Sequence, residues 1–438
     1  MNIKLTKKSL NYLLVFYFIF SFAFALYYAL EQSKKKTDAS FKKIMFSKDL
    51  IRAGADKFLP ADSAAYNSMA ISLLESKGFQ YPNGKYTASV SVGTPIYLAI
   101  IYKIFGYRLF WVIFVNTCLA TLSLLYIYKI AALVVTEQVA WIAFFLHFIN
   151  IRFTYHLASI GNYSLFIFLL LLSFYFAIML TKTVPSIMKY ALFGFIAGVI
   201  ILVRPLVAPV MGIIFIYVFL KERKIKFIMI SIVIASLLVS SWLIRNYQKL
   251  GMPIFNTRNY IGFLEGNNDA YDNISLSESY YLPSIKLDKK QEQALSEMAE
   301  QYDERGYITI LMQINNTWVK ENKERFVKNI IWRIKGILSP YTRDMSLRNK
   351  IIAAISWSFM FIPGLIGLAT LPDKNIRVIL TLSCLCFLFI PAIVVVDKYL
   401  HYRLPVNILL TITAASAYNR FFAKFINCKH ANNNLNTT

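Results

Sequence analysis

The sequence predicts an all-α protein that crosses a membrane about ten times, and three observations support this prediction. The 438 residues are 57% hydrophobic and only 16% charged, whereas soluble domains carry about 25% charged residues. The mean hydropathy is +0.51. Ten apolar stretches approach the roughly 20 helical residues needed to cross about 30 Å of hydrocarbon. This pattern excludes a soluble enzyme, and the four scattered cysteines exclude a disulfide scaffold and a zinc finger.

The apolar stretches follow one another along most of the chain. They cover residues 10–30, 109–130, 138–158, 162–180, 189–203, 206–220, 226–244, 351–371, 376–396 and 404–421. The first follows a basic N-terminus but precedes no small-residue cleavage site, so we expect an uncleaved span. Only Arg204 and Pro205 separate the fifth stretch from the sixth, which are therefore either two spans or one broken helix.

Basic residues in short loops set the expected orientation, because cytoplasmic loops are enriched in Lys and Arg. A cytoplasmic N-terminus places the basic loop after the sixth stretch and the C-terminal tail inside. The two long polar segments, 31–108 and 245–350, then lie outside. We expect helical patterns at 288–302, 306–321 and 323–338 in the second of them. The predicted parts are a membrane module (1–244), an outer domain (245–350) and C-terminal membrane helices with a cytoplasmic tail (351–438).

This orientation gathers ionisable residues at one membrane face. The residues concerned are Asp62, Arg152, His156, Arg204, Arg245, His401 and Arg403. Ionisable groups at the ends of spans tend to mark a site, although an arginine at an interface also snorkels towards water. Guanidinium groups bind phosphate oxygens through two hydrogen bonds. The outer face is therefore the expected site, and a phosphorylated lipid is the expected partner.

Two short helices are predicted in the first outer segment. From Tyr66 onward, apolar residues recur on one helical face through Leu74, but this helix is too short to span and should lie along the bilayer surface. The stretch 94–106 has the same character. Asp62 begins the first helix, either as its N-cap or as a general base that takes a proton from an acceptor hydroxyl. The two roles are compatible.

Four stretches share this outer placement. They are Asp62-x3-Tyr66 with Thr94-Pro95-Ile96-Tyr97, Gly194-x3-Gly198 with Arg204-Pro205, Trp242 through Tyr247 with Gly266-Asn267-Asn268, and Tyr402-Arg403-Leu404-Pro405. Together they resemble the polytopic GT-C glycosyltransferases that use polyprenyl-phosphate sugars, of the protein-mannosyltransferase and aminoarabinose-transferase type. The resemblance implies inverting sugar transfer, in which the acidic residue of the first outer loop, here Asp62, acts as the base or positions the acceptor. It implies that the donor phosphate is bound by Arg204, Arg245 and Arg403.

The remaining site predictions concern the substrates. Substrate-binding roles are predicted for Tyr66, His156, Asn246, Asn267 and His401. The outer loop 150–162 has no carboxylate, unlike the corresponding loop in many members of the family, so either His156 or Asn162 stands in or Asp62 acts alone. One carboxylate with neutral neighbours is a poor site for a hard cation. We therefore expect no metal and no cofactor.

The leading functional hypothesis is a bacterial inner-membrane glycosyltransferase. It transfers a sugar from an undecaprenyl-phosphate donor to a glycan or lipid-linked acceptor of the O-antigen or lipopolysaccharide type, at the periplasmic face. Both termini are then cytoplasmic, and no nucleic acid is involved despite a net charge of +24. Two alternatives remain: an O-antigen polymerase or ligase, and a glycolipid transporter or flippase.

Overall fold

The computed structural model describes residues 6–37, 45, 61–81, 83–267, 287, 289–341, 346–394 and 400–435. Within these ranges every regular element is a helix, apart from one isolated bridge between Gln80 and Tyr86. Seven of the described helices are long and apolar enough to cross a membrane. The predicted all-α polytopic membrane fold is therefore confirmed.

Seven of the ten predicted spans correspond directly to these helices. They are α1 (Lys7–Thr37), α7 (Leu109–Val134), α10 (Tyr163–Leu180), α12 (Ala208–Glu222), α13 (Ile225–Leu250), α18 (Leu347–Thr370) and α19 (Lys374–Val394). A further predicted span is the shorter apolar helix α11 (Ile187–Val203). The last is contained in α20 (Leu404–Leu435), whose first half is buried against α8 and α18.

The prediction of one continuous span over 138–158 is wrong. The chain forms α8 (Glu137–Phe148), then the short helices α9 (Ile151–Tyr155) and η1 (His156–Ala158). The side-chain amide of Asn116 on α7 donates to the carbonyl oxygens of Leu157, at 3.1 Å, and Ser159, at 3.2 Å. These bonds satisfy two carbonyl groups of the irregular backbone that would otherwise be buried without a partner.

Helices α11 and α13 pack closely because glycine lines their interface. A Cβ atom added at Gly194 would lie 2.6 Å from the Cα of Ser231, and one added at Gly198 would lie 3.3 Å from the Cα of Ala235. Small residues four apart allow two membrane helices to approach in this way. The contacts advance in the same direction along both helices, so α11 and α13 run parallel. Since α12 returns the chain between them, the stretches on either side of Arg204 are two separate helices.

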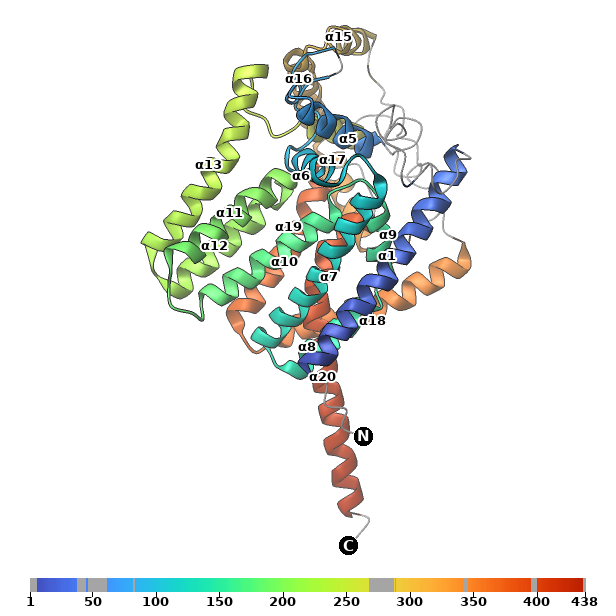
Figure 1. The fold of residues 1–438 in the computed structure, drawn as a ribbon, viewed down its shortest axis with the longest axis vertical. Helices are drawn as coiled ribbons and strands as arrows, with labels where there is room; N and C mark the ends of the chain where they lie inside the picture. Colours follow the sequence, from blue (N-terminus) through green and yellow to red (C-terminus); the bar gives the residue numbers. More distant parts are fainter. Residues whose placement is uncertain are drawn as a thin grey trace.

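The outer segments form a cap at one end of the helix bundle. The cap contains α5 (Ala61–Leu74), α6 (Gly93–Phe105), α14 (Arg258–Gly266), α15 (Lys289–Glu300), α16 (Glu304–Glu321) and α17 (Lys323–Leu338). Figure 1 shows α5, α6, α15, α16 and α17 near one end and both chain termini at the other. The bounds of α15, α16 and α17 agree with the predicted patterns. Because α13 continues to Leu250, the predicted division at 244 falls inside a helix.

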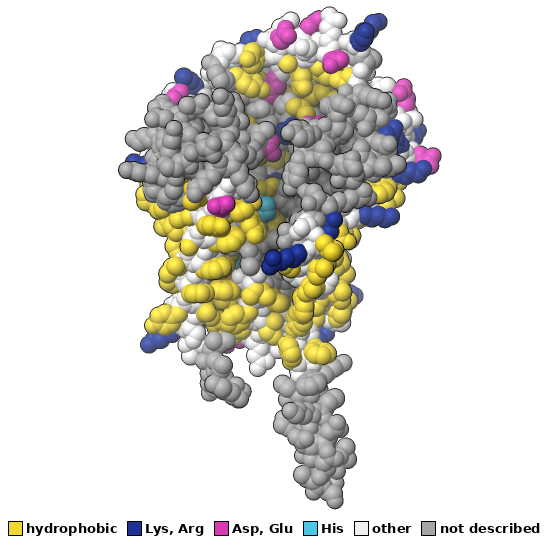
Figure 2. All heavy atoms as spheres, turned by 90° about the vertical axis from the view of Figure 1, so that its right-hand side faces the viewer, with side chains coloured by type: hydrophobic (Ala, Val, Ile, Leu, Met, Phe, Trp, Pro, Cys, Tyr) yellow, Lys and Arg dark blue, Asp and Glu magenta, His cyan; other side chains and the backbone are white. Residues whose placement is uncertain are grey.

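The two predicted surface helices pack against each other within this cap. The Tyr102 hydroxyl on α6 donates to the side-chain oxygen of Asn67 on α5 at 2.6 Å. Figure 2 shows a broad band of hydrophobic side chains on one face of the molecule, with most charged side chains above it and a few Lys and Arg along its lower edge. This distribution matches a bundle that crosses a bilayer and carries a polar cap.

Candidate active site

Asp62 lies in the first turn of α5, where the helix dipole favours a negative charge. Its side chain is 64% exposed, and one carboxylate oxygen lies 3.8 Å from Nε of Arg258 on α14. Arg258 also pairs with Glu265, whose carboxylate oxygen is 3.3 Å from Nη1. Burial raises the pKa of the Glu265 carboxyl, and the Arg258 charge opposes this shift. One guanidinium is thus shared between an exposed and a buried carboxylate.

Tyr66 follows Asp62 by one turn and faces the start of α10. Its hydroxyl lies 3.4 Å from the side-chain nitrogen of Asn162, which donates to it. Burial raises the pKa of Tyr66, the Asp62 carboxylate raises it further, and Arg204 opposes the shift. Tyr66 therefore remains a neutral phenol, and Asp62 and Arg204 are both close enough to act on it.

Arg204 lies at the break between α11 and α12. Its backbone is extended, with φ −147° and ψ 92°, as expected before a proline. The guanidinium carbon lies 5.4 Å from the ring centroid of Tyr163 and 5.1 Å from those of Phe166 and Tyr402. In the described part of the chain, no hydrogen-bond acceptor is within bonding distance of this guanidinium. Three rings therefore hold the cation, and its N–H donors are open to a ligand.

His156 belongs to the same neighbourhood. Its ring centroid lies 4.5 Å from that of Tyr163, which is one of the rings that hold Arg204. Of the residues predicted from the sequence, the structure thus brings together Asp62, Tyr66, His156 and Arg204. The substrate-binding role of His156 remains a prediction.

Arg245 and Asn246 lie near the end of α13 and fasten it to the first outer segment. Arg245 donates to the carbonyl oxygens of Phe79, at 2.8 Å, and Thr87, at 2.9 Å, and to the Asn246 side chain at 2.8 Å. The buried amide of Asn246 also donates to the carbonyl oxygen of Ile254 at 2.7 Å. Both side chains are occupied by contacts within the protein, and their predicted ligand roles remain predictions.

Arg403 is fully buried beneath the cap. It donates to the carbonyl oxygen of Ser339, and its guanidinium carbon lies 4.8 Å from the ring centroid of Trp357. This places Arg403 against the end of α17 rather than in the ring cluster around Arg204, and its predicted phosphate-binding role remains a prediction. The side chains of His401 and Arg152 lie outside the described residues.

Asn267 is also buried, directly after α14. Its side-chain oxygen accepts a hydrogen bond from Arg333 at 2.9 Å, and its amide donates to the carbonyl oxygen of Phe263 at 2.8 Å. The end of α14 at Gly266 and Asn267 is thus held by an arginine of α17. Its ligand-binding role remains a prediction.

Three residues at this end of the molecule were not singled out from the sequence: Arg258, Glu265 and Glu304. The buried Glu304 accepts from the backbone N–H of Ala88 at 3.0 Å and from the Thr257 hydroxyl. It thereby joins the first outer segment to α14. An N-cap at Asp303, which accepts from the Gly306 N–H at 3.0 Å, is the only local signal near Glu304.

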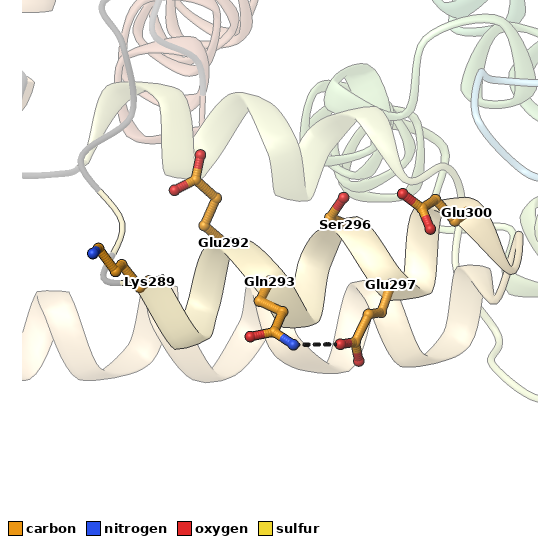
Figure 3. A pocket seen from close by; sticks show the side chains of 6 residues that line it. All are labelled: Lys289, Glu292, Gln293, Ser296, Glu297 and Glu300. Atoms are coloured by element: carbon orange, nitrogen blue, oxygen red, sulfur yellow. Dashed lines mark hydrogen bonds between the residues drawn. The ribbon is translucent and has the colours of Figure 1, made fainter.

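Two hollows stand out among the described residues of the outer segments. One is a cavity of about 370 Å³ between α5, the segment that follows it, α14, and the α15–α16 junction, and Asp62 and Arg258 line it. The other is a shallow hollow of about 410 Å³ along α15. Figure 3 shows that its side chains, including Glu292, Glu297 and Glu300, all come from this one helix. Because these side chains are exposed and none comes from another element, only the first hollow is built from several parts of the chain.

The sequence matches no described protein family, and no curated protein matches it. Several solved structures resemble the fold, among them two oligosaccharyltransferase structures. One is an oligosaccharyltransferase from Archaeoglobus fulgidus tethered to an acceptor peptide, with a TM-score of 0.48 and 13% identity over 93% of this chain and 50% of that chain. The other is the archaeal oligosaccharyltransferase AglB from the same organism with an inhibitory peptide and a dolichol-phosphate, with a TM-score of 0.48 and 12% identity over 95% of this chain and 51% of that chain. The chain spans about half the length of these proteins, so the assignment of its site depends on its own residues.

Proposed function

We propose that the chain is a membrane glycosyltransferase that moves a sugar from a polyprenyl-phosphate donor to a cell-surface acceptor at the capped end of the bundle. The observation that carries this proposal is geometric. Tyr66 follows Asp62 by one helical turn, and its hydroxyl bonds to Asn162 at 3.4 Å, next to the Tyr163 ring that lies 5.4 Å from the Arg204 guanidinium. A sugar transferase of this kind needs a base for the acceptor and a cation for the leaving phosphate within one site.

Asp62 is the proposed base. Its carboxylate is exposed, so an acceptor hydroxyl can reach it. The acceptor oxygen bonds to the anomeric carbon while its proton passes to Asp62, and the bond from that carbon to the phosphate oxygen breaks. Arg258 lies 3.8 Å from one oxygen of Asp62 in an exposed ion pair, which is weak and leaves the carboxylate accessible.

Arg204 is the proposed ligand of the donor phosphate. As the carbon–oxygen bond breaks, the polyprenyl phosphate leaves with an additional negative charge. The guanidinium stabilises this charge by bidentate hydrogen bonds, since the aromatic rings around it leave its donors open. The apolar spans on either side suit a polyprenyl chain. We place this site at the periplasmic face of a bacterial inner membrane, with both termini in the cytoplasm.

The experiment that tests this proposal is complementation of a strain that lacks the gene. Wild type, Asp62→Asn, Arg204→Ala and the exposed-site control Arg348→Ala are expressed at matched levels, verified by blot. Surface glycans are then compared by mass spectrometry. We expect wild type and Arg348→Ala to restore a sugar that Asp62→Asn and Arg204→Ala do not.

Full restoration by Asp62→Asn would show that the carboxylate has no chemical role and would overturn the proposal. The two alternative hypotheses, an O-antigen polymerase or ligase and a glycolipid transporter or flippase, would then be favoured. If Arg204→Ala restores the sugar and Asp62→Asn does not, Asp62 remains the proposed base and a different cation binds the donor phosphate.

A further inference from the structure

The cavity beside Asp62 has walls from both outer segments. Tyr81 belongs to the segment after α5, Tyr307 to α16, and Tyr302 to the turn between α15 and α16. The rings of Tyr81 and Tyr302 lie 5.4 Å apart and are tilted by 55°. With a volume of about 370 Å³, the cavity has room for one or two sugar rings.

The charges of the cavity walls are unbalanced. Its lining includes three carboxylates, those of Asp62, Asp303 and Glu304, and one guanidinium, that of Arg258. Three negative charges and one positive charge leave an excess of negative charge in the lining, although Arg245, outside the lining, partly offsets the charge of Glu304. Arg258 is also shared with Glu265, outside the lining, so its charge is already engaged. An incoming phosphate, sulfate or carboxylate group would therefore be repelled.

Tyr302 contributes a half-exposed aromatic ring to the cavity wall. Its φ of 53° is left-handed, although the position after a helix in this conformation usually belongs to glycine or asparagine. A tyrosine there is strained. Its side chain is 44% exposed, so packing in the core does not account for it. A ring held at a strained position in the wall of a cavity is suited to stack on a ligand.

We infer that this cavity binds the acceptor and selects a sugar that is uncharged or carries an ammonium group over one that carries an acid group. The inference rests on the proposed function, because Asp62 is both a wall of the cavity and the proposed base. A hydroxyl of a sugar stacked on Tyr302 faces this carboxylate. The donor phosphate, in contrast, is held by Arg204 and its rings. The two substrates are thus separated by charge, with the anionic donor at the guanidinium and the acceptor at the carboxylates.

The test measures binding to the full chain in lipid nanodiscs, without any donor. Saturation-transfer-difference NMR is recorded with methyl β-glucoside, glucosamine and glucuronic acid at about 10 mM. We expect the first two to bind and glucuronic acid to bind at least about tenfold more weakly. Equal or tighter binding of glucuronic acid, or no binding of any probe, would overturn the inference.

The variant Tyr302→Gly separates the role of the ring from its contribution to folding. Glycine relieves the left-handed strain, so the thermal midpoint should stay the same or rise while binding of methyl β-glucoside weakens at least about fivefold. Tyr341→Ala removes another exposed tyrosine that does not line the cavity, and it should bind as wild type does. Unchanged binding by Tyr302→Gly would exclude this cavity as the sugar site.

Because no donor is present, the outcomes for this inference and for the proposed function are distinct. Suppose that sugars bind with the expected selectivity but the Asp62→Asn variant still restores the surface glycan. The cavity would then remain a sugar site, and the transferase proposal would be rejected. Loss of glycan restoration in Asp62→Asn, together with tight binding of glucuronic acid, would support the transferase and reject the selectivity.

Discussion

The guanidinium of Arg333 on α17 donates to the carbonyl oxygen of Ala392 near the end of α19 at 2.8 Å. The same side chain donates to the carbonyl oxygen of Gly266, at the end of α14. Carbonyl groups in the last turn of a helix have no partner within the helix and carry the negative end of its dipole. One buried cation therefore joins the ends of a membrane helix and of the helix that carries Arg258 and Glu265.

Replacing Arg333 with methionine should destabilise the fold and impair transfer together. The change leaves buried carbonyl groups without their donor, which should cost about 3 kcal/mol of unfolding free energy. Thermal unfolding of the purified full chain measures this loss. Lys335→Met, on the exposed side of the same helix, is the control and should unfold as wild type does. An unchanged midpoint for Arg333→Met would mean that water replaces the guanidinium.

Replacing Arg204 with lysine should retain part of the activity, whereas alanine should remove most of it. Lysine keeps the positive charge but has neither the planar fork that binds phosphate bidentately nor the surface that stacks on the three rings. We expect transfer rates lowered by about 10²–10³ for Arg204→Ala and by less for Arg204→Lys. Rates are compared with those of Arg348→Ala. Equal rates for the lysine and wild-type proteins would show that only charge is needed.

Glu265 should make the stability depend on pH. Burial raises the pKa of this carboxyl in the folded chain, with Arg258 opposing the shift. A carboxyl of raised pKa stabilises the fold below its unfolded value of about 4.3, and this contribution is lost as the pH rises through the folded value. Relative to Glu265→Gln, wild type should therefore lose stability as the pH rises from about 4.3 through the raised folded value.

Thermal midpoints across this pH range test the prediction. Glu300→Gln, an exposed carboxylate of α15, is the matched control and should give a curve parallel to that of wild type. A difference between wild type and Glu265→Gln that stays constant with pH would contradict the assigned shift. A difference of the opposite sign would show that the Arg258 ion pair outweighs burial.

Replacing Gly194 with leucine should disrupt the packing of α11 against α13. A Cβ atom at this position would already lie 2.6 Å from the Cα of Ser231, so the two helices must separate. Overpacking of this kind costs about 1–3 kcal/mol. Gly212→Leu, on α12, places its side chain where no atom lies within 4 Å and should be nearly neutral. Comparable thermal midpoints for the two variants would contradict a close α11–α13 contact.

The membrane helices and the cap helices α15, α16 and α17 could be predicted from the sequence because each depends on a local pattern. Apolar length determines which segments cross a bilayer, and helical periodicity predicted the positions of α15, α16 and α17. The stretch 138–158 is the exception. Its apolar composition indicated one span, but the carbonyl groups at Leu157 and Ser159 bond to Asn116, which lies on another helix.

The site was only partly predictable for the same reason. Asp62 and Arg204 stand out because a carboxylate before an interfacial helix and an arginine at a helix break are local signals. No local signal in the sequence marks Arg258, Glu265 and Glu304 themselves, because their roles depend on contacts with other segments. Glu304, for example, bonds to Ala88 across 216 residues. Nothing in the sequence distinguished Arg204, whose donors are open, from Arg245, whose donors hold backbone carbonyl groups.

The parallel course of α11 and α13 makes the order of membrane insertion matter. Two parallel neighbours require one complete crossing between them, so Gly194 meets Ser231 only after α12 has been inserted in the opposite direction. If α12 stayed outside the bilayer, α13 would cross the other way and its small residues would lie at the wrong depth. The glycine contact would then be lost, and the end of α13 would not reach the first outer segment. The tight α11–α13 interface therefore forms only in a chain whose α12 has crossed the bilayer.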